Sequence, residues 1–256
     1  MQKDTIKDWA IPIVLMLILT VLFRIFPWDL QLQAIFYQFE NKRWFMEDDF
    51  LISLLDKYGY IPALVMSLLS AFVLIAGFRN LQFEKFRKIA LLFLLTIAIG
   101  PGLIVHGVFK EHWGRPRPHD IVEFGGTYAH LQVLQSSSGR GKSFPSGHAA
   151  LGFIVLVPYF FLRKTNSKTA LSFLALGLFY GTLRGIGRMT QGAHFASDVL
   201  WSGGLVYLTG LAMFYLLRMN KSIYWVSGQK LKDWSTSSFK LKLINLWRNK
   251  LIYSSY

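Results

Sequence analysis

Long apolar runs constrain this chain more than any other feature of its sequence. A helix needs about 20 mostly apolar residues to cross a bilayer. By that criterion about six runs qualify, at residues 9–26, 61–78, 89–109, 149–162, 170–186 and 199–217. The sequence therefore predicts an all-α polytopic membrane protein with about six transmembrane helices.

Composition supports the same fold class. Of the 256 residues, 16% are charged and 53% are hydrophobic, whereas soluble domains carry about 25% charged residues. Cysteine is absent, which excludes disulfides and thiolate chemistry. A net charge of +14 in a soluble protein would indicate nucleic acid. Here the basic residues lie mainly between and after apolar runs, so no nucleic-acid partner is predicted.

Three segments lie outside the apolar runs. Residues 28–60 mix aromatic and charged side chains, which predicts an interfacial segment after the first span. Residues 110–147 form the longest polar loop between spans. Residues 218–256 carry eight basic residues against one acidic residue, alternating with apolar ones. We expect a membrane-embedded domain at residues 1–217, followed by a basic amphipathic cytoplasmic tail at residues 218–256, with a disordered tail as the alternative.

Charge predicts the topology. The loops at residues 79–88 and 163–168 are basic, whereas the segment after the first span is rich in acids. Because basic loops stay in the cytoplasm, both termini are expected inside. The loops that contain residues 110–118, 146–148 and 188–194 then all face outward.

One candidate catalytic histidine stands where the fourth run begins. His148 closes a Pro-Ser-Gly-His sequence that starts at Pro145. Free N–H groups at a helix start bind anions, Ser146 adds a hydroxyl and Gly147 allows a close approach. Alone, this sequence is equally consistent with an ordinary helix start.

A second histidine stands where the sixth run begins. His194 and Asp198 are four residues apart, so on a helix they share one face. A carboxylate bonded to one imidazole nitrogen leaves the other nitrogen as a nucleophile or base. The alternative, a pair of interfacial charges that reach toward water, is weaker for residues with this mutual spacing.

Cations complete the set of candidate phosphate-binding residues. Lys110 ends the third run, and prolines on both sides stiffen the chain around Arg117. Arg115 and Arg117 alternate, so an extended chain points only one of them at a phosphate. Arg188 and Arg184 end the fifth run, where a guanidinium fork suits phosphate oxygens. For Arg184 the alternative is an interfacial charge that reaches water.

Together these motifs resemble the three signatures of the type 2 phosphatidic acid phosphatase superfamily. The matches are Lys110-x6-Arg117-Pro118, Pro145-Ser-Gly-His148 and Arg188-x5-His194-x3-Asp198. Three ordered motifs make the resemblance specific, and it covers most of the spans. One departure is Gly187, where the family usually has serine.

The resemblance implies a role for each motif residue. His194 is implied as the nucleophile that becomes a phosphohistidine, Asp198 as the residue that orients it, and His148 as the acid and then the base. The residues implied to hold the phosphate oxygens are Lys110, Arg117, Ser146, Gly147 and Arg188. Cations that stabilise the charge take the place of a metal, so neither a metal nor another cofactor is expected.

The substrate is narrowed by a second resemblance. Residues 117–126 are similar to the corresponding segment of bacterial lipid A phosphatases, which implies lipid A as the substrate. Together with the topology predicted from charge, we expect an active site on the periplasmic face of the bacterial inner membrane. Arg115, Arg140 and Lys142 add charge for a second phosphate or sugar, or are solvated loop charges. Phosphatidylglycerol phosphate, phosphatidic acid and undecaprenyl pyrophosphate remain alternatives.

Two other functions use the same motifs. A lipid-to-lipid phosphotransferase would pass the phosphate to a second lipid instead of water. An inactive membrane scaffold is disfavoured because every motif residue is intact. The expected partners are a membrane lipid and the bilayer, and the sequence gives no sign of an obligate protein partner.

Overall fold

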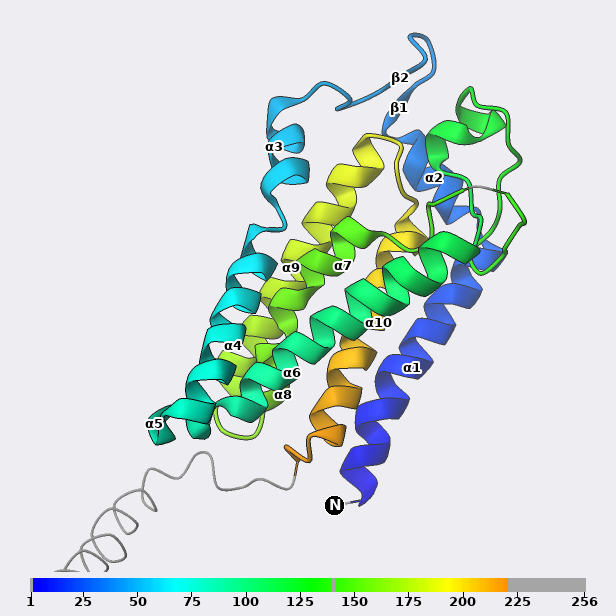
Figure 1. Cartoon of the computed structure of the whole chain (residues 1–256). Helices are drawn as coiled ribbons and strands as arrows, with labels where there is room; N and C mark the ends of the chain where they lie inside the picture. The colour runs from blue at the N-terminus through cyan, green and yellow to red at the C-terminus, as the bar shows by residue number, and fades with distance from the viewer. Residues whose placement is uncertain (1, 140, 221–256) are drawn as a thin grey trace, which may run out of the picture. The chain divides into compact units, whose positions relative to one another are not determined.

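A computed structural model describes residues 2–139 and 141–220 as a bundle of helices with one short hairpin (Figure 1). The elements in chain order are α1 (Gln2–Ile25), α2 (Trp28–Ala34), β1 (Tyr37–Gln38), β2 (Arg43–Trp44), α3 (Phe50–Tyr58), α4 (Ile61–Arg79), α5 (Leu81–Glu84), α6 (Arg87–Ile97), η1 (Ala98–Lys110), η2 (Pro118–Asp120), η3 (Val122–Phe124), α7 (Gly147–Phe153), η4 (Ile154–Leu156), α8 (Pro158–Leu162), α9 (Ser167–Thr190) and α10 (Ala196–Leu216). The predicted fold class is confirmed.

The apolar runs form the long helices of the bundle. Within the described residues, five stretches are long and apolar enough to cross a membrane, and a shorter apolar one covers Gly147–Leu162. Large apolar side chains on α4 are widely exposed, including Leu68 at 61% and Phe72 at 61%. Such a surface would aggregate in water, but it suits contact with lipid. The five long stretches are Thr5–Ile25, Phe50–Arg79, Arg87–Lys110, Ser167–Thr190 and Ala196–Leu216.

The fourth span is short because it is interrupted. It begins at Gly147, two residues before the predicted start, and tightens to a 3₁₀ turn at η4 before α8 resumes at Pro158. Proline has no N–H to continue an α-helical ladder. The span packs closely on α9, where a Cβ on Gly181 would lie 2.3 Å from the Phe153 ring. Small residues at such contacts let helices approach closely in membranes.

The third span changes its winding on the way to the polar loop. It is α-helical to Ile97 and π-helical from Ala98 to Lys110, with Pro101 inside the π segment. A π segment is uncommon and often accompanies a functional site. Here it ends at Lys110, one of the candidate phosphate-binding residues.

The predicted interfacial segment is ordered and folds over the polar loop. It contains α2, the β1–β2 hairpin with Tyr37 opposite Trp44, and α3. Aromatic and aliphatic side chains join the hairpin to the polar loop and to the residue before α10. This aromatic cluster consists of Tyr37, Trp44, Ile121, Phe124 and Phe195.

The two ends of the bundle differ in their chemistry. The starts of α7 and α10, the end of α9, and α2 and α3 all lie at one end (Figure 1). The short helix α5, which lies within the basic loop at residues 79–88, and the turn between α8 and α9 lie at the other end. The three motifs thus share one end of the bundle. The predicted tail at residues 218–256 lies almost wholly outside the described residues, and the domain boundary at residue 217 stays a prediction.

Candidate active site

The structure brings the residues of the three motifs together where α7 and α10 begin and α9 ends. The charges of Arg117 and Arg188 act on Lys110. Those of Lys110 and Arg188 act on His194, which lies in the short loop between α9 and α10. Arg188 and His194 in turn act on His148. Two histidines and three cations therefore surround one small region.

His194 is held with one ring nitrogen occupied and the other available. Its side chain is 1% exposed, and Nδ1 lies 2.6 Å from the carbonyl oxygen of Ser143. A carbonyl can only accept a hydrogen bond, so Nδ1 carries the proton and Nε2 carries the lone pair. Burial lowers the pKa of His194 below its ordinary value, which keeps the ring neutral at neutral pH. This tautomer is the one a nucleophilic imidazole needs.

Asp198 lies behind His194 and does not touch it closely. Its Oδ2 is 3.8 Å from His194 Nδ1. Ser143 stands between them, because its hydroxyl donates to Asp198 Oδ2 at 2.6 Å while its carbonyl accepts from His194. The backbone N–H of Phe195 donates to the same carboxylate oxygen at 2.8 Å. Asp198 thus acts on the nucleophile through Ser143 and through its charge, and its orienting role stays a prediction.

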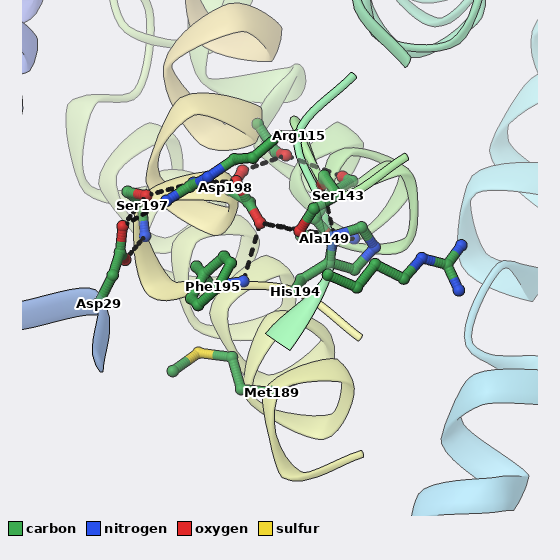
Figure 2. A network of polar contacts seen from close by, with 12 residues as sticks. Asp29, Arg115, Ser143, Ala149, Met189, His194, Phe195, Ser197 and Asp198 are labelled. Carbon is green, nitrogen blue, oxygen red and sulfur yellow. Dashed lines mark hydrogen bonds and ion pairs between the residues drawn. The ribbon is translucent and has the colours of Figure 1, made fainter. Parts of the chain in front are cut away.

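Arg115 does not face a substrate, which corrects its assignment as a candidate for a second phosphate or sugar. Its side chain is fully buried and bridges Asp198 Oδ1 at 2.5 Å and Asp29 Oδ2 at 2.8 Å (Figure 2). It also donates to Ser197 Oγ at 2.8 Å and lies 4.5 Å from the centre of the Phe195 ring. Burial alone would lower the pKa of Arg115, but Asp198 and Asp29 hold it above its ordinary value.

Asp29 is a residue of this site that sequence reasoning missed. It lies on α2 and is 3% exposed. Ser197 donates to it twice, from its N–H at 2.9 Å and from its hydroxyl at 2.5 Å. A signal was present, because Asp29 is the one charged residue between Trp28 and Phe39, and a charge needs a partner once it is buried. Its distance from residues 115 and 197 along the chain hid that partner.

Ser146 and Gly147 form a tight turn at the start of α7. Ser146 is fully buried, and its hydroxyl accepts from the N–H of Ala149 at 3.4 Å. The hydroxyl of Ser202 on α10 donates to the Ser146 carbonyl at 2.8 Å, which ties the two helix starts together. A Cβ on Gly147 would lie 2.6 Å from His106 Nε2. His106 therefore packs directly against the site.

The second half of the site contains a further unpredicted acid. Asp56 Oδ1 on α3 lies 3.2 Å from His148 Nε2 and 2.9 Å from Arg188 Nη1. Arg188 also donates to Gln191 Oε1 at 2.6 Å. Arg184 lines the same small pocket and is 2% exposed, so it does not reach water as the alternative reading held. No local pattern marked Asp56, since α3 precedes every motif.

The remaining predicted cations differ in their surroundings. Arg117 is half-buried, and its backbone N–H donates to Asp120 Oδ2 at 3.1 Å. Lys142 is exposed and pairs with Glu111 at 2.8 Å, and an exposed pair of this kind contributes little and can exchange with solvent. Arg140 lies outside the described residues. Of the two alternating arginines, Arg117 is the one left for the phosphate.

The other histidines serve local structure. The His112 ring lies 2.9 Å from the Val108 carbonyl, His119 lies 3.3 Å from Asp120, and His130 packs edge-on against Phe195. Within the part of the chain that the structure describes, no group of three or more His, Asp and Glu side chains is arranged to hold a metal ion.

Comparison with known proteins agrees with this geometry. The sequence profile of the PAP2 superfamily matches residues 89–222. A lipid A 4'-phosphatase of Francisella tularensis subsp. novicida is 32% identical over 205 residues, which cover 78% of this chain and 91% of that protein. The lipid A 4'-phosphatases of Rhizobium leguminosarum and Rhizobium etli are 32% and 31% identical over 64% of the chain, and cover 70% and 63% of those proteins. No solved structure matches the chain.

Proposed function

The chain belongs to the PAP2 superfamily, and from this membership we propose that it removes a phosphate monoester from lipid A at a membrane surface through a phosphohistidine at His194. The names of its relatives, all lipid A 4'-phosphatases, support the substrate. The network around His194 supports the mechanism.

One observation carries the mechanism: the buried, neutral His194 whose Nδ1 donates to Ser143. In this proposal Nε2 attacks phosphorus, a nitrogen–phosphorus bond forms and the ester bond breaks. His148 gives its proton to the leaving sugar oxygen. His148 then takes a proton from water, whose oxygen attacks phosphorus, and the nitrogen–phosphorus bond breaks to release phosphate and free His194.

The surrounding groups supply charge stabilisation. Phosphoryl transfer depends mainly on positioning and on neutralising the equatorial oxygens. We assign these oxygens to Lys110, Arg117 and Arg188, with the Ser146 hydroxyl and the Gly147 N–H as further donors. Mutual repulsion among the three cations favours binding of an anion among them. These residues take the part that a metal ion plays elsewhere, and the proposed reaction needs none.

The proposed location is the inner membrane of a bacterium, with the site on the periplasmic face. The motifs lie at the end of the bundle opposite α5 and the turn between α8 and α9 (Figure 1). The loops at residues 79–88 and 163–168, which contain α5 and this turn, are basic. The positive-inside rule then places them in the cytoplasm.

Cysteine labelling tests this orientation in the cysteine-free chain. Ser138 is exposed and so is Ser167 at the start of α9. The neighbouring Ser137 is left unchanged because its hydroxyl donates to the Gly114 carbonyl. In spheroplasts an impermeant maleimide should label Ser138→Cys and spare Ser167→Cys. The reverse pattern would place the site in the cytoplasm.

Phosphate release from purified lipids tests the substrate. In matched mixed micelles, a diphosphorylated lipid A should be turned over faster than phosphatidic acid, with and without EDTA. Release of phosphate from a single lipid also separates hydrolysis from transfer to a second lipid. Faster turnover of phosphatidylglycerol phosphate or undecaprenyl pyrophosphate would overturn the substrate, and rescue of an EDTA-inactivated enzyme by a divalent ion would overturn the mechanism.

A further inference from the structure

The helix α3 places a carboxylate among groups that the proposed function assigns to phosphate. A single oxygen, Asp56 Oδ1, lies 3.2 Å from His148 Nε2 and 2.9 Å from Arg188 Nη1. These two groups would meet the leaving oxygen and an equatorial oxygen of a bound phosphoryl group. The carboxylate therefore occupies part of the space that a substrate phosphate requires.

The placement of Asp56 is built into the fold. The Asp49 side chain caps α3 by accepting from the N–H of Ile52 at 2.9 Å, which fixes where the helix starts. The helix packs on α9, and an added Cβ on Gly187 would lie 3.4 Å from Leu55 Cδ2 and 3.8 Å from Ile52 Cδ1. The residue where the superfamily usually has serine thus lies directly beneath α3. An added Cβ there would make ordinary van der Waals contact with this helix.

The acid leaves part of the surrounding charge unsatisfied. Arg188 Nε, Arg184 Nη1 and Asp56 Oδ1 itself are buried without a hydrogen-bond partner, so Asp56 meets His148 and Arg188 as a nearby charge and not through a well-formed hydrogen bond. The contact from Arg184 Nη2 to the Asp56 carbonyl is long, at 3.5 Å. One carboxylate thus faces two guanidinium groups and an imidazole. Buried donors without partners are costly, and an anion with more oxygens and more charge than a carboxylate would satisfy them better.

We propose that Asp56 is a stand-in for the substrate phosphate. It pairs with His148 and Arg188 while the site is empty, the incoming phosphate displaces it, and its return helps to expel the inorganic phosphate product. This inference rests on the proposed function, because it assigns His148 and Arg188 to phosphate. Asp56 is a positioning residue, since it acts through those two side chains.

Competition between Asp56 and phosphate for the same groups should weaken phosphate binding by a measurable factor. When a binding-competent state is only partly populated, the apparent affinity falls by that fraction. If Asp56 occupies the site nine-tenths of the time, phosphate binds about tenfold more weakly than it would without the carboxylate. Asp56→Asn keeps the shape of the side chain and removes its charge, so it should tighten phosphate binding.

The experiment measures inhibition by inorganic phosphate and by orthovanadate on the purified full chain, with four proteins side by side. Asp56→Asn should lower the inhibition constant of both anions about tenfold. Asp49→Asn is the matched control, because it removes an equal charge from the same helix while asparagine still caps it. It should leave the constants unchanged. Arg188→Ala should raise them.

The outcomes separate the two proposals. Tighter inhibition in Asp56→Asn alone supports the stand-in, and a misfolded variant cannot produce a gain of affinity. If Arg188→Ala weakens inhibition but Asp56→Asn behaves like Asp49→Asn, the stand-in is wrong and the proposed function stands. If phosphate does not inhibit the unaltered enzyme, or Arg188→Ala has no effect, the phosphate site is misassigned and both proposals fall.

Discussion

The two halves of the site are built in opposite ways. On the nucleophile side, the side chains of His194, Asp198, Arg115 and Asp29 are at most 3% exposed, and both carboxylates are bonded on both oxygens (Figure 2). On the acid side, His148 and Asp56 are about a third exposed, at 37% and 32%. Two buried guanidinium nitrogens there have no partner.

The difference follows the chemistry that each side performs. A nucleophile gains from being held in place before the substrate arrives, since no reorganisation is then needed at the moment of reaction. The acid side must admit a lipid headgroup, contact its leaving oxygen and then admit water. A rigid charge network suits the first task, and an exchangeable ion pair suits the second.

Among the changes that test this comparison, removing Arg115 should have the largest effect on stability and turnover. Arg115→Ala leaves two buried carboxylates without their cation, which costs about 3–5 kcal/mol. We expect a lower melting temperature in detergent together with loss of nearly all turnover. Arg117→Ala is the matched control, two residues away in the same loop. It should reduce kcat/KM by about 10²–10³-fold as a lost charge-stabilising donor and leave the melting temperature unchanged. If both variants lost the same stability, the assignment of Arg115 to the buried carboxylates and of Arg117 to the phosphate would be wrong.

A smaller change isolates positioning from stability. Asp29→Asn keeps the shape and removes one charge from a residue that meets neither His194 nor the phosphate. Outer residues that orient reactive groups contribute about 10–100-fold, so kcat should fall by that order while KM stays unchanged. A rise in KM at constant kcat would show that Asp29 acts on substrate binding.

The smallest expected effect is a shift in pH dependence. Protonated His194 cannot attack phosphorus, and burial lowers its pKa below its ordinary value. As pH falls through about 6.5, the ordinary pKa of a histidine, kcat/KM should therefore persist and decline only at lower pH. The profile needs a phosphomonoester whose second ionisation lies well below this range. An acid limb at or above the ordinary histidine value would mean that His194 is not desolvated in the working enzyme.

The sequence predicts those features of this molecule that depend on residues close together along the chain. Apolar runs and short motifs are local, so the spans and residues such as Lys110, His148 and His194 are predictable. Arg115 and Arg117 show where local reasoning ends: alternation indicated that only one faces a phosphate, but only the fold identifies which. Asp29 and Asp56 belong to no motif, and their partners lie far along the chain. Ser143 acts through its backbone carbonyl, which no side-chain pattern reveals.

Trapping the phosphoenzyme is the most direct test of the roles assigned to His194, the rigidly held nucleophile, and His148, the acid with an exchangeable partner. The enzyme is mixed with a radiolabelled aryl phosphate, whose good leaving group needs no proton, and then quenched in alkali, where phosphohistidine survives. The unaltered protein and His112→Ala, an exposed histidine outside the site, should carry label transiently. His148→Ala should accumulate it, and His194→Ala should carry none and release no phosphate. Label or turnover in His194→Ala would contradict the assignment of the nucleophile.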